Sequence, residues 1–143
     1  MRPRRIYLFS TMPTSKANEN CSIQNTTKAK LPHLPFVEMK EAVLGADYEL
    51  SVMFVDVDHM TALNLQYRRL NKPTDILSFP ISNTEGEIFI NLEETKKEAV
   101  KFDREYENFL AFLFIHGLTH LKGFDHSSTM ESEEEKIRKQ FGI

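Results

Sequence analysis

The feature that most constrains this 143-residue chain is a group of three histidines, His116, His120 and His126, within eleven residues. The largely apolar segment 105–121 predicts a central helix, on which His116 and His120 lie one turn apart on the same face. Gly123 can adopt the left-handed conformation that ends a helix, so the chain can turn there and bring His126 toward the other two histidines. Three neutral imidazoles around Zn²⁺ leave a fourth position for water, as in catalytic zinc sites. The pattern therefore predicts a hydrolytic site with one zinc ion.

Three other interpretations of the histidines are weaker. Their spacing matches the metalloprotease pattern H-E-x-x-H-x-x-G-x-x-H, but Gly117 stands where that pattern has the glutamate that activates water. A structural zinc site usually has four protein ligands that include cysteines, and Cys21 is the single cysteine of the chain. Three core histidines without a metal would need several separate hydrogen-bond partners. Asp125, beside His126, is expected to be a hydrogen-bond partner of the site or a carboxylate that stabilises the loop, and not a ligand.

The apolar pattern mixes helices and strands without strict alternation, which predicts an α+β fold in one domain over residues 21–143. Strands are expected at 22–25, 50–57, 76–79 and 87–90. Helices are expected at 34–44, at 105–121 and from 128 onward, and a further helix is expected to begin at a cap on Asn91. Another helix is expected to run from a cap at Asp58 to a break at Lys72. Its apolar face would consist of Met60, Leu63, Tyr67 and Leu70. Residues 1–20 differ in composition and are expected to form a mobile N-terminal extension.

Charge and cysteine content limit the classes of partner and compartment. The net charge of −3 is unlike that of a generally basic RNA-coating protein, so any contact with nucleic acid must be local. The acidic run 131–135 is expected to be the solvated start of the last helix. The longest apolar run is too short to cross a membrane, and the single cysteine excludes an internal disulfide framework. We therefore expect a cytoplasmic protein.

A second informative segment, residues 63–80, reads LNLQYRRLNKPTDILSFP. It predicts a helix, a proline turn and a strand, with Arg68 and Lys72 near the turn. Two interpretations of Arg68 and Lys72 are open: they face an anion at this turn, or they are solvated charges at the end of a helix.

The two segments together resemble the YbeY family of bacterial endoribonucleases. The resemblance continues through Gly86-Glu87-Ile88 and the last helix, and covers residues 21–143 in consistent order. This chain differs from the family's pattern at Asn71, Thr119 and Phe124, and at Phe112, where the family often has a further histidine.

The resemblance implies a metal-dependent endoribonuclease that acts on single-stranded RNA in ribosomal RNA maturation and ribosome quality control, and the three histidines indicate that the metal is zinc. Its implied partners are single-stranded RNA, ribosomal RNA and the small ribosomal subunit, with neither a membrane nor DNA. It also implies a compact fold with a four-stranded mixed sheet and about five helices, and we expect the zinc in a cleft beside residues 72–78.

The expected roles within that cleft are specific. Arg68 and His116 are the candidate catalytic residues; His116, His120 and His126 are the metal ligands; Arg68, Lys72 and Ser78 contact the substrate. The sequence leaves open whether water or the RNA 2′-hydroxyl attacks the phosphorus. The alternative function is a non-catalytic ribosome-assembly factor whose zinc organises the fold.

Overall fold

The computed structural model describes residues 20–123 and 128–143, which form one mixed sheet covered by helices. The strands are β1 (Cys21–Asn25), β2 (Glu49–Phe54), β3 (Ile76–Ser82) and β4 (Glu85–Ile90). The helices are α1 (Phe36–Leu44), α2 (Val57–Arg68), α3 (Leu92–Lys101), α4 (Tyr106–Leu121) and α5 (Ser128–Gln140). The predicted α+β fold, with four strands and five helices among the described residues, is confirmed. Residues 1–19 of the expected N-terminal extension lie outside the described residues.

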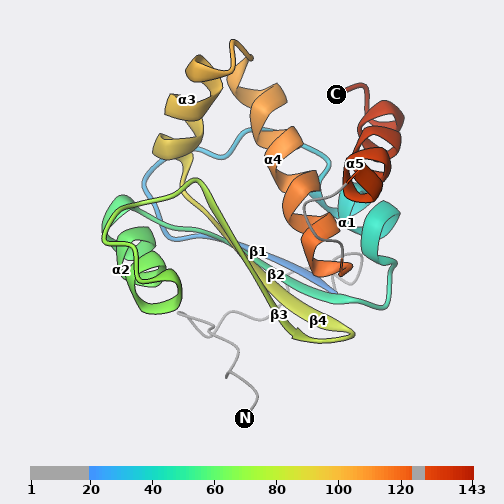
Figure 1. Cartoon of the computed structure of the whole chain (residues 1–143), viewed down its shortest axis with the longest axis horizontal. Coiled ribbons are helices and arrows are strands. Elements are labelled where there is room, and N and C mark those ends of the chain that lie inside the picture. The colour runs from blue at the N-terminus through green and yellow to red at the C-terminus, as the bar shows by residue number, and fades with distance from the viewer. Residues whose placement is uncertain (1–19, 124–127) are drawn as a thin grey trace.

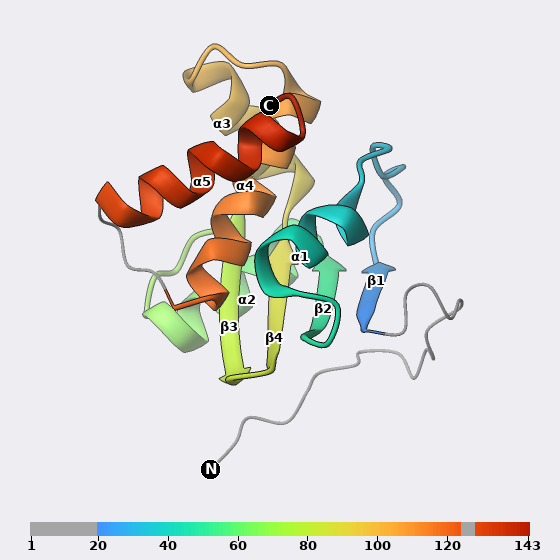
Figure 2. The same ribbon diagram turned by 90° about the vertical axis from the view of Figure 1, so that its right-hand side faces the viewer.

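The sheet has the strand order β1-β2-β4-β3, which can be followed across Figure 2. β2 pairs in parallel with both β1 and β4, whereas β3 pairs antiparallel with β4, so the predicted mixed sheet is confirmed. β3 and β4 form a hairpin, with Ser82 opposite Glu85. β3 is an edge strand, which explains why Pro80 is tolerated within it.

Alternating side chains of the central strands supply two apolar layers. Leu50 and Val52 face α1 and α4, together with Ile88 of β4. Met53 of β2 and Phe89 of β4 face the other side and pack against α2. This period of two is the one expected for side chains of a strand. Figure 2 accordingly shows α4 and α2 on opposite faces of the sheet.

The ends of α2 differ from the prediction. Asp56, not Asp58, caps the helix, because its backbone is extended and its carboxylate accepts a 2.8 Å hydrogen bond from the His59 N–H. The helix ends at Arg68, and Arg69 adopts a left-handed conformation with φ 58°. Tyr67 therefore lies in the last turn, where it is 46% exposed. Leu70 lies beyond the helix, so neither residue belongs to its buried face.

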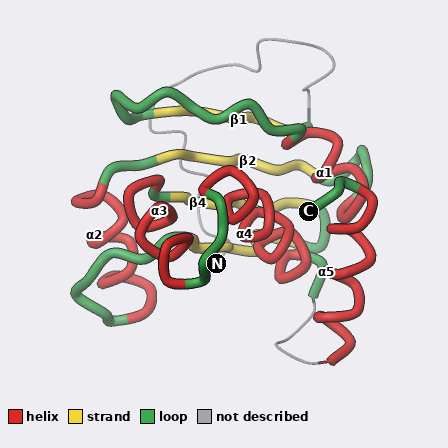
Figure 3. Tube along the Cα trace, turned by 90° about the horizontal axis from the view of Figure 1, so that it is seen from above, coloured by secondary structure: helices red, strands yellow, loops and turns green. Residues whose placement is uncertain are grey.

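Helix α4 lies between α3 and α5 in Figure 1 and Figure 3, and it is buried along most of its length. At Gly117 it approaches the sheet closely: a Cβ atom there would lie 2.8 Å from Ile76 Cδ1 and 2.9 Å from Ser78 Oγ. Gly123 follows the helix with φ +101°, as predicted for the residue that ends it. Within the described part of the chain, no helix is long and apolar enough to cross a membrane.

Candidate metal centre

The predicted helical pair of histidines lies on one face of α4. The ring centroids of His116 and His120 are 4.7 Å apart, and the rings are almost perpendicular at 87°. Both rings line a cavity of about 550 Å³ between α4 and β3, and both are partly buried. This arrangement brings two imidazoles to the wall of one solvent-connected cleft.

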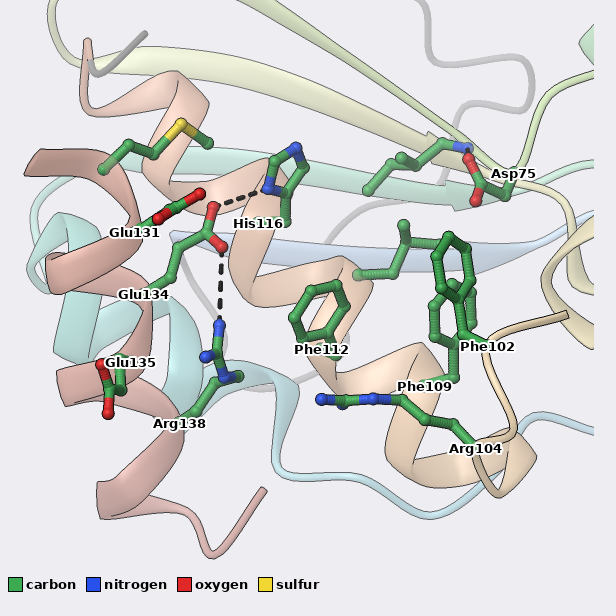
Figure 4. A pocket seen from close by; sticks show the side chains of 13 residues that line it. Asp75, Phe102, Arg104, Phe109, Phe112, His116, Glu131, Glu134, Glu135 and Arg138 are labelled. Carbon is green, nitrogen blue, oxygen red and sulfur yellow. Dashed lines mark hydrogen bonds and ion pairs between the residues drawn. The ribbon is translucent and has the colours of Figure 1, made fainter. Parts of the chain in front are cut away.

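Glu134 of α5 holds the ring of His116 in place. Its Oε1 lies 2.6 Å from His116 Nδ1 (Figure 4) and 3.1 Å from the Thr119 hydroxyl, which donates to it. Arg138 lies one turn further along α5, with 3.6 Å between its guanidinium and Glu134 Oε2. Burial acts to raise the pKa of Glu134, but the hydrogen bonds and positive partners outweigh burial and lower this pKa below its usual value.

This position of Glu134 corrects the expectation that residues 131–135 are all solvated. Glu134 is only 5% exposed, because it lies on the face of α5 that also carries buried Met130 and Ile137. Its spacing of four residues from Met130 and three from Ile137 places it on that face, and this was the signal in the sequence. Glu131 and Glu135, by contrast, are exposed as expected.

The donor set around His116 fits a zinc ion. An ionised Glu134 accepts the proton of Nδ1, so the lone pair of the ring lies on Nε2, the atom that would bind a metal. A carboxylate that orients a histidine in this way is the usual support of a zinc ligand. Among residues 20–123 and 128–143, no three His, Cys, Asp or Glu side chains form a group that could hold a metal. The third predicted ligand, His126, and its neighbour Asp125 lie outside the described residues.

The structure places the predicted substrate-binding residues unequally. Arg68 and Ser78 line the same cavity as the two histidines. The Ser78 hydroxyl also donates a long hydrogen bond of 3.4 Å to the Gly117 carbonyl. Lys72 is exposed and is not one of the described residues that line this cavity. The cleft therefore combines imidazoles with one arginine, a combination suited to an anionic substrate.

The comparisons with known proteins decide the family of this chain. The sequence model of the family described as Endoribonuclease YbeY matches residues 14–142. The chain belongs to this family. An Endoribonuclease YbeY of Mycoplasma capricolum is 39% identical over 64% of this chain, although the match spans only 60% of that protein. Another, from Oceanobacillus iheyensis, is 33% identical over 77% of this chain and 84% of its own length.

A solved structure supports the fold of this YbeY family member. The solution structure of a Thermotoga maritima protein has a TM-score of 0.65 and 28% sequence identity. It covers 85% of this chain and 89% of its own.

Two residues of the 63–80 segment shape the cleft although the sequence did not single them out. The buried amide of Asn64 donates a 2.8 Å hydrogen bond to the Lys72 carbonyl, which fixes the turn after α2. Asp75 lines the cleft, and its carboxylate accepts a 2.8 Å hydrogen bond from the Ile76 N–H. Burial raises the pKa of Asp75 above its usual value, although this hydrogen bond opposes the shift. The one signal for either residue was its place within a segment shared with the YbeY family.

Proposed function

We propose that this chain is a zinc-dependent endoribonuclease that cleaves single-stranded RNA during ribosomal RNA maturation and quality control. Membership of the YbeY family supports the enzyme class. The zinc ion, the ribosomal RNA, the small ribosomal subunit and the cytoplasmic location are part of the proposal. The observation that carries it is the bond between Glu134 and His116, one helical turn from His120, in a cleft that Arg68 also lines.

The proposed ligands of the zinc are His116, His120 and His126. A zinc ion bound there supplies Lewis acidity, which polarises a phosphate oxygen of the RNA. Glu134 orients the His116 ring from its Nδ1 side, and the Thr119 hydroxyl helps to hold Glu134. These contacts fix one ligand before any metal arrives, which lowers the cost of ordering the site.

Arg68 and the backbone around it account for the choice of an anionic substrate. Its guanidinium can donate two parallel hydrogen bonds to a phosphate group and stabilise negative charge as this develops during cleavage. The turn that follows Arg68 is held by Asn64. Lys72 is exposed near this turn, so it can contact the RNA backbone outside the cleft.

Replacing one ligand tests whether the metal is catalytic. We expect His120→Ala to bind zinc far more weakly and to lose cleavage of single-stranded RNA at a temperature where circular dichroism shows it folded. His33→Ala is the matched control, because His33 is exposed and does not line the cleft. Wild-type cleavage by the folded, zinc-free His120→Ala protein would refute the proposal. The assembly-factor alternative instead predicts a much lower melting temperature and a joint loss of RNA binding.

A further inference from the structure

A second, larger cavity of about 950 Å³ adjoins the metal cleft between α4, α5 and the segment that joins α3 to α4. The two cavities share three residues, Asp75, Ile76 and His116. His116 therefore has the cleft with Arg68 on one side and this second cavity on the other. A ligand that occupies both cavities passes beside His116 and beside Asp75, the carboxylate that the two cavities share.

Three phenylalanines form an aromatic platform in this cavity, which we define as Phe102, Phe109 and Phe112. The ring centroids of Phe102 and Phe109 are 5.7 Å apart, and those of Phe109 and Phe112 are 5.9 Å apart. Both pairs are nearly parallel, with interplanar angles of 18° and 19°. Phe109 is buried and anchors the platform, whereas Phe102 is 64% exposed. The platform thus presents a fixed aromatic surface to solvent, the kind of surface on which a flat ring can stack.

Two arginines converge on the same platform. The guanidinium carbons of Arg104 and Arg138 lie 4.5 and 5.0 Å from the Phe112 ring centroid. Figure 4 shows these side chains approaching Phe112 from the start of α4 and from α5. Arg138 is partly neutralised by Glu134 at 3.6 Å, so Arg104 is the cation of the two that can pair with a further anion. A phosphate group fits this requirement, because it accepts hydrogen bonds from guanidinium in a matching geometry.

The acidic residues on the α5 wall offset part of this charge, because Glu134 pairs with Arg138, whereas Arg104 donates to the neutral amide oxygen of Asn108. Glu134 is held by His116 and Arg138, and Glu135 lies 3.3 Å from Lys139. Glu131 is exposed on the same wall and would repel a phosphate near it. The favourable position for a phosphate is therefore at the Arg104 side of the platform, away from α5.

We propose that this cavity is a subsite for one unpaired nucleotide of the RNA, next to the phosphodiester that is cleaved. The base stacks on the exposed ring of Phe102, and a phosphate of the nucleotide pairs with Arg104, which lies over the Phe112 ring. The proposal rests on the proposed function, because it takes RNA as the substrate. Stacking on aromatic rings tolerates any base but requires one that is not already paired. The subsite thus gives a physical reason for acting on single strands.

The test is a double-mutant cycle between the protein and the RNA, read as binding. Fluorescence anisotropy measures the Kd of the full chain, in EDTA to prevent cleavage, for a short single-stranded RNA and for versions with one abasic nucleotide at successive positions. We expect one position at which loss of the base weakens binding by about 5- to 140-fold, the range of base–aromatic stacking. Phe102→Leu, which keeps an apolar side chain, should weaken binding of the intact RNA. In this variant, loss of the base at that position should also leave the Kd almost unchanged.

The controls keep the outcomes separate. Val100→Ala removes an exposed apolar side chain from the end of α3 outside the cavity, and should bind like wild type. Phe102→Leu is expected to keep the wild-type melting temperature, because Phe102 is exposed; Phe112→Leu provides a second test of the platform. The proposal is overturned if the abasic effect is equal in wild type and both variants. It is also overturned if both variants bind RNA like wild type, as expected if the cavity takes a peptide instead.

Cleavage is measured separately with zinc present. A wild-type chain that shows the coupling but does not cleave RNA would support the subsite and overturn the proposed nuclease. A chain that cleaves without the coupling would overturn the subsite and leave the nuclease in place.

Discussion

The bond between Glu134 and His116 leads to a quantitative prediction for Glu134→Gln. The substituted amide retains an oxygen that can accept from His116 Nδ1, but it loses the negative charge that stabilises the bound imidazole. Since Glu134 is only 5% exposed, water cannot replace that charge. Loss of a residue that supports a metal ligand typically costs about 10- to 100-fold in metal affinity, or about 1.4–2.8 kcal/mol. We therefore expect the zinc Kd of Glu134→Gln to rise by this factor.

The same substitution also affects the metal-free fold. Glu134 accepts from His116 and Thr119 and pairs with Arg138, so its amide weakens several charge-assisted contacts at once. We expect a loss of about 1–3 kcal/mol of stability, which lowers the melting temperature in EDTA by about 3–9 °C. Zinc affinity must therefore be measured by chelator competition at a temperature where both proteins are folded.

Glu135→Gln is the matched control, because it makes the same change one position along α5. Glu135 is exposed and pairs with Lys139 at 3.3 Å, so its zinc affinity and melting temperature should stay close to wild type. If Glu134→Gln binds zinc as tightly as Glu135→Gln while melting at a lower temperature, Glu134 supports the fold alone. The inference that it positions a metal ligand would then be wrong.

Three further predictions test the cleft and its packing. Arg68→Ala should reduce RNA cleavage with little change in zinc content or melting temperature. The control is Arg69→Ala, which changes a neighbour that does not line the cleft. If the two variants cleave RNA equally well, Arg68 has no special role in the cleft. Gly117→Ala should lower the free energy of unfolding by about 1 kcal/mol in denaturant titrations, because its Cβ would lie 2.8 Å from Ile76 Cδ1 and the higher helix propensity of alanine offsets part of the overpacking; an unchanged midpoint would show that the neighbouring side chains move away freely. The purified protein should bind about one zinc ion through nitrogen at about 2.0–2.1 Å, and sulfur coordination in X-ray absorption would exclude the three-histidine site.

Local patterns predicted most of the fold because they reflect local physics. The strand β4 follows from its run of apolar residues, and Asn91 caps α3 by accepting a 2.8 Å bond from the Glu94 N–H, as its side chain suggested. The start of α2 was predicted wrongly at Asp58, because Asp56 and Asp58 are both residue types that cap helices. The choice between them depends on where β2 ends, and sheet pairing determines that end. Local propensity alone does not contain this information.

The site shows the same division between local and tertiary information. The helical spacing of His116 and His120 predicted that they share a face, and their rings do lie side by side. Asn64 was missed because its amide bonds to a carbonyl eight residues later, a contact that only the folded turn creates. Glu134 was missed because it lies within an acidic run that resembles a solvated surface. Its position on the face of Met130 distinguishes it from its neighbours.

Gly117 and Glu134 together explain how this site differs from the metalloprotease pattern that the histidines match. A glutamate at position 117 would have to displace side chains of β3, since even a Cβ atom would lie 2.9 Å from Ser78 Oγ. The carboxylate near the histidines comes instead from α5, and it contacts His116 at Nδ1. Nδ1 and Nε2 point to different sides of an imidazole, so Glu134 is on the side away from a metal bound at Nε2. It can orient the ligand, but it is poorly placed to take a proton from a water molecule that attacks the substrate. If the proposed zinc binds His116 at Nε2, the carboxylate positions a ligand here and does not act as the general base that the metalloprotease pattern requires.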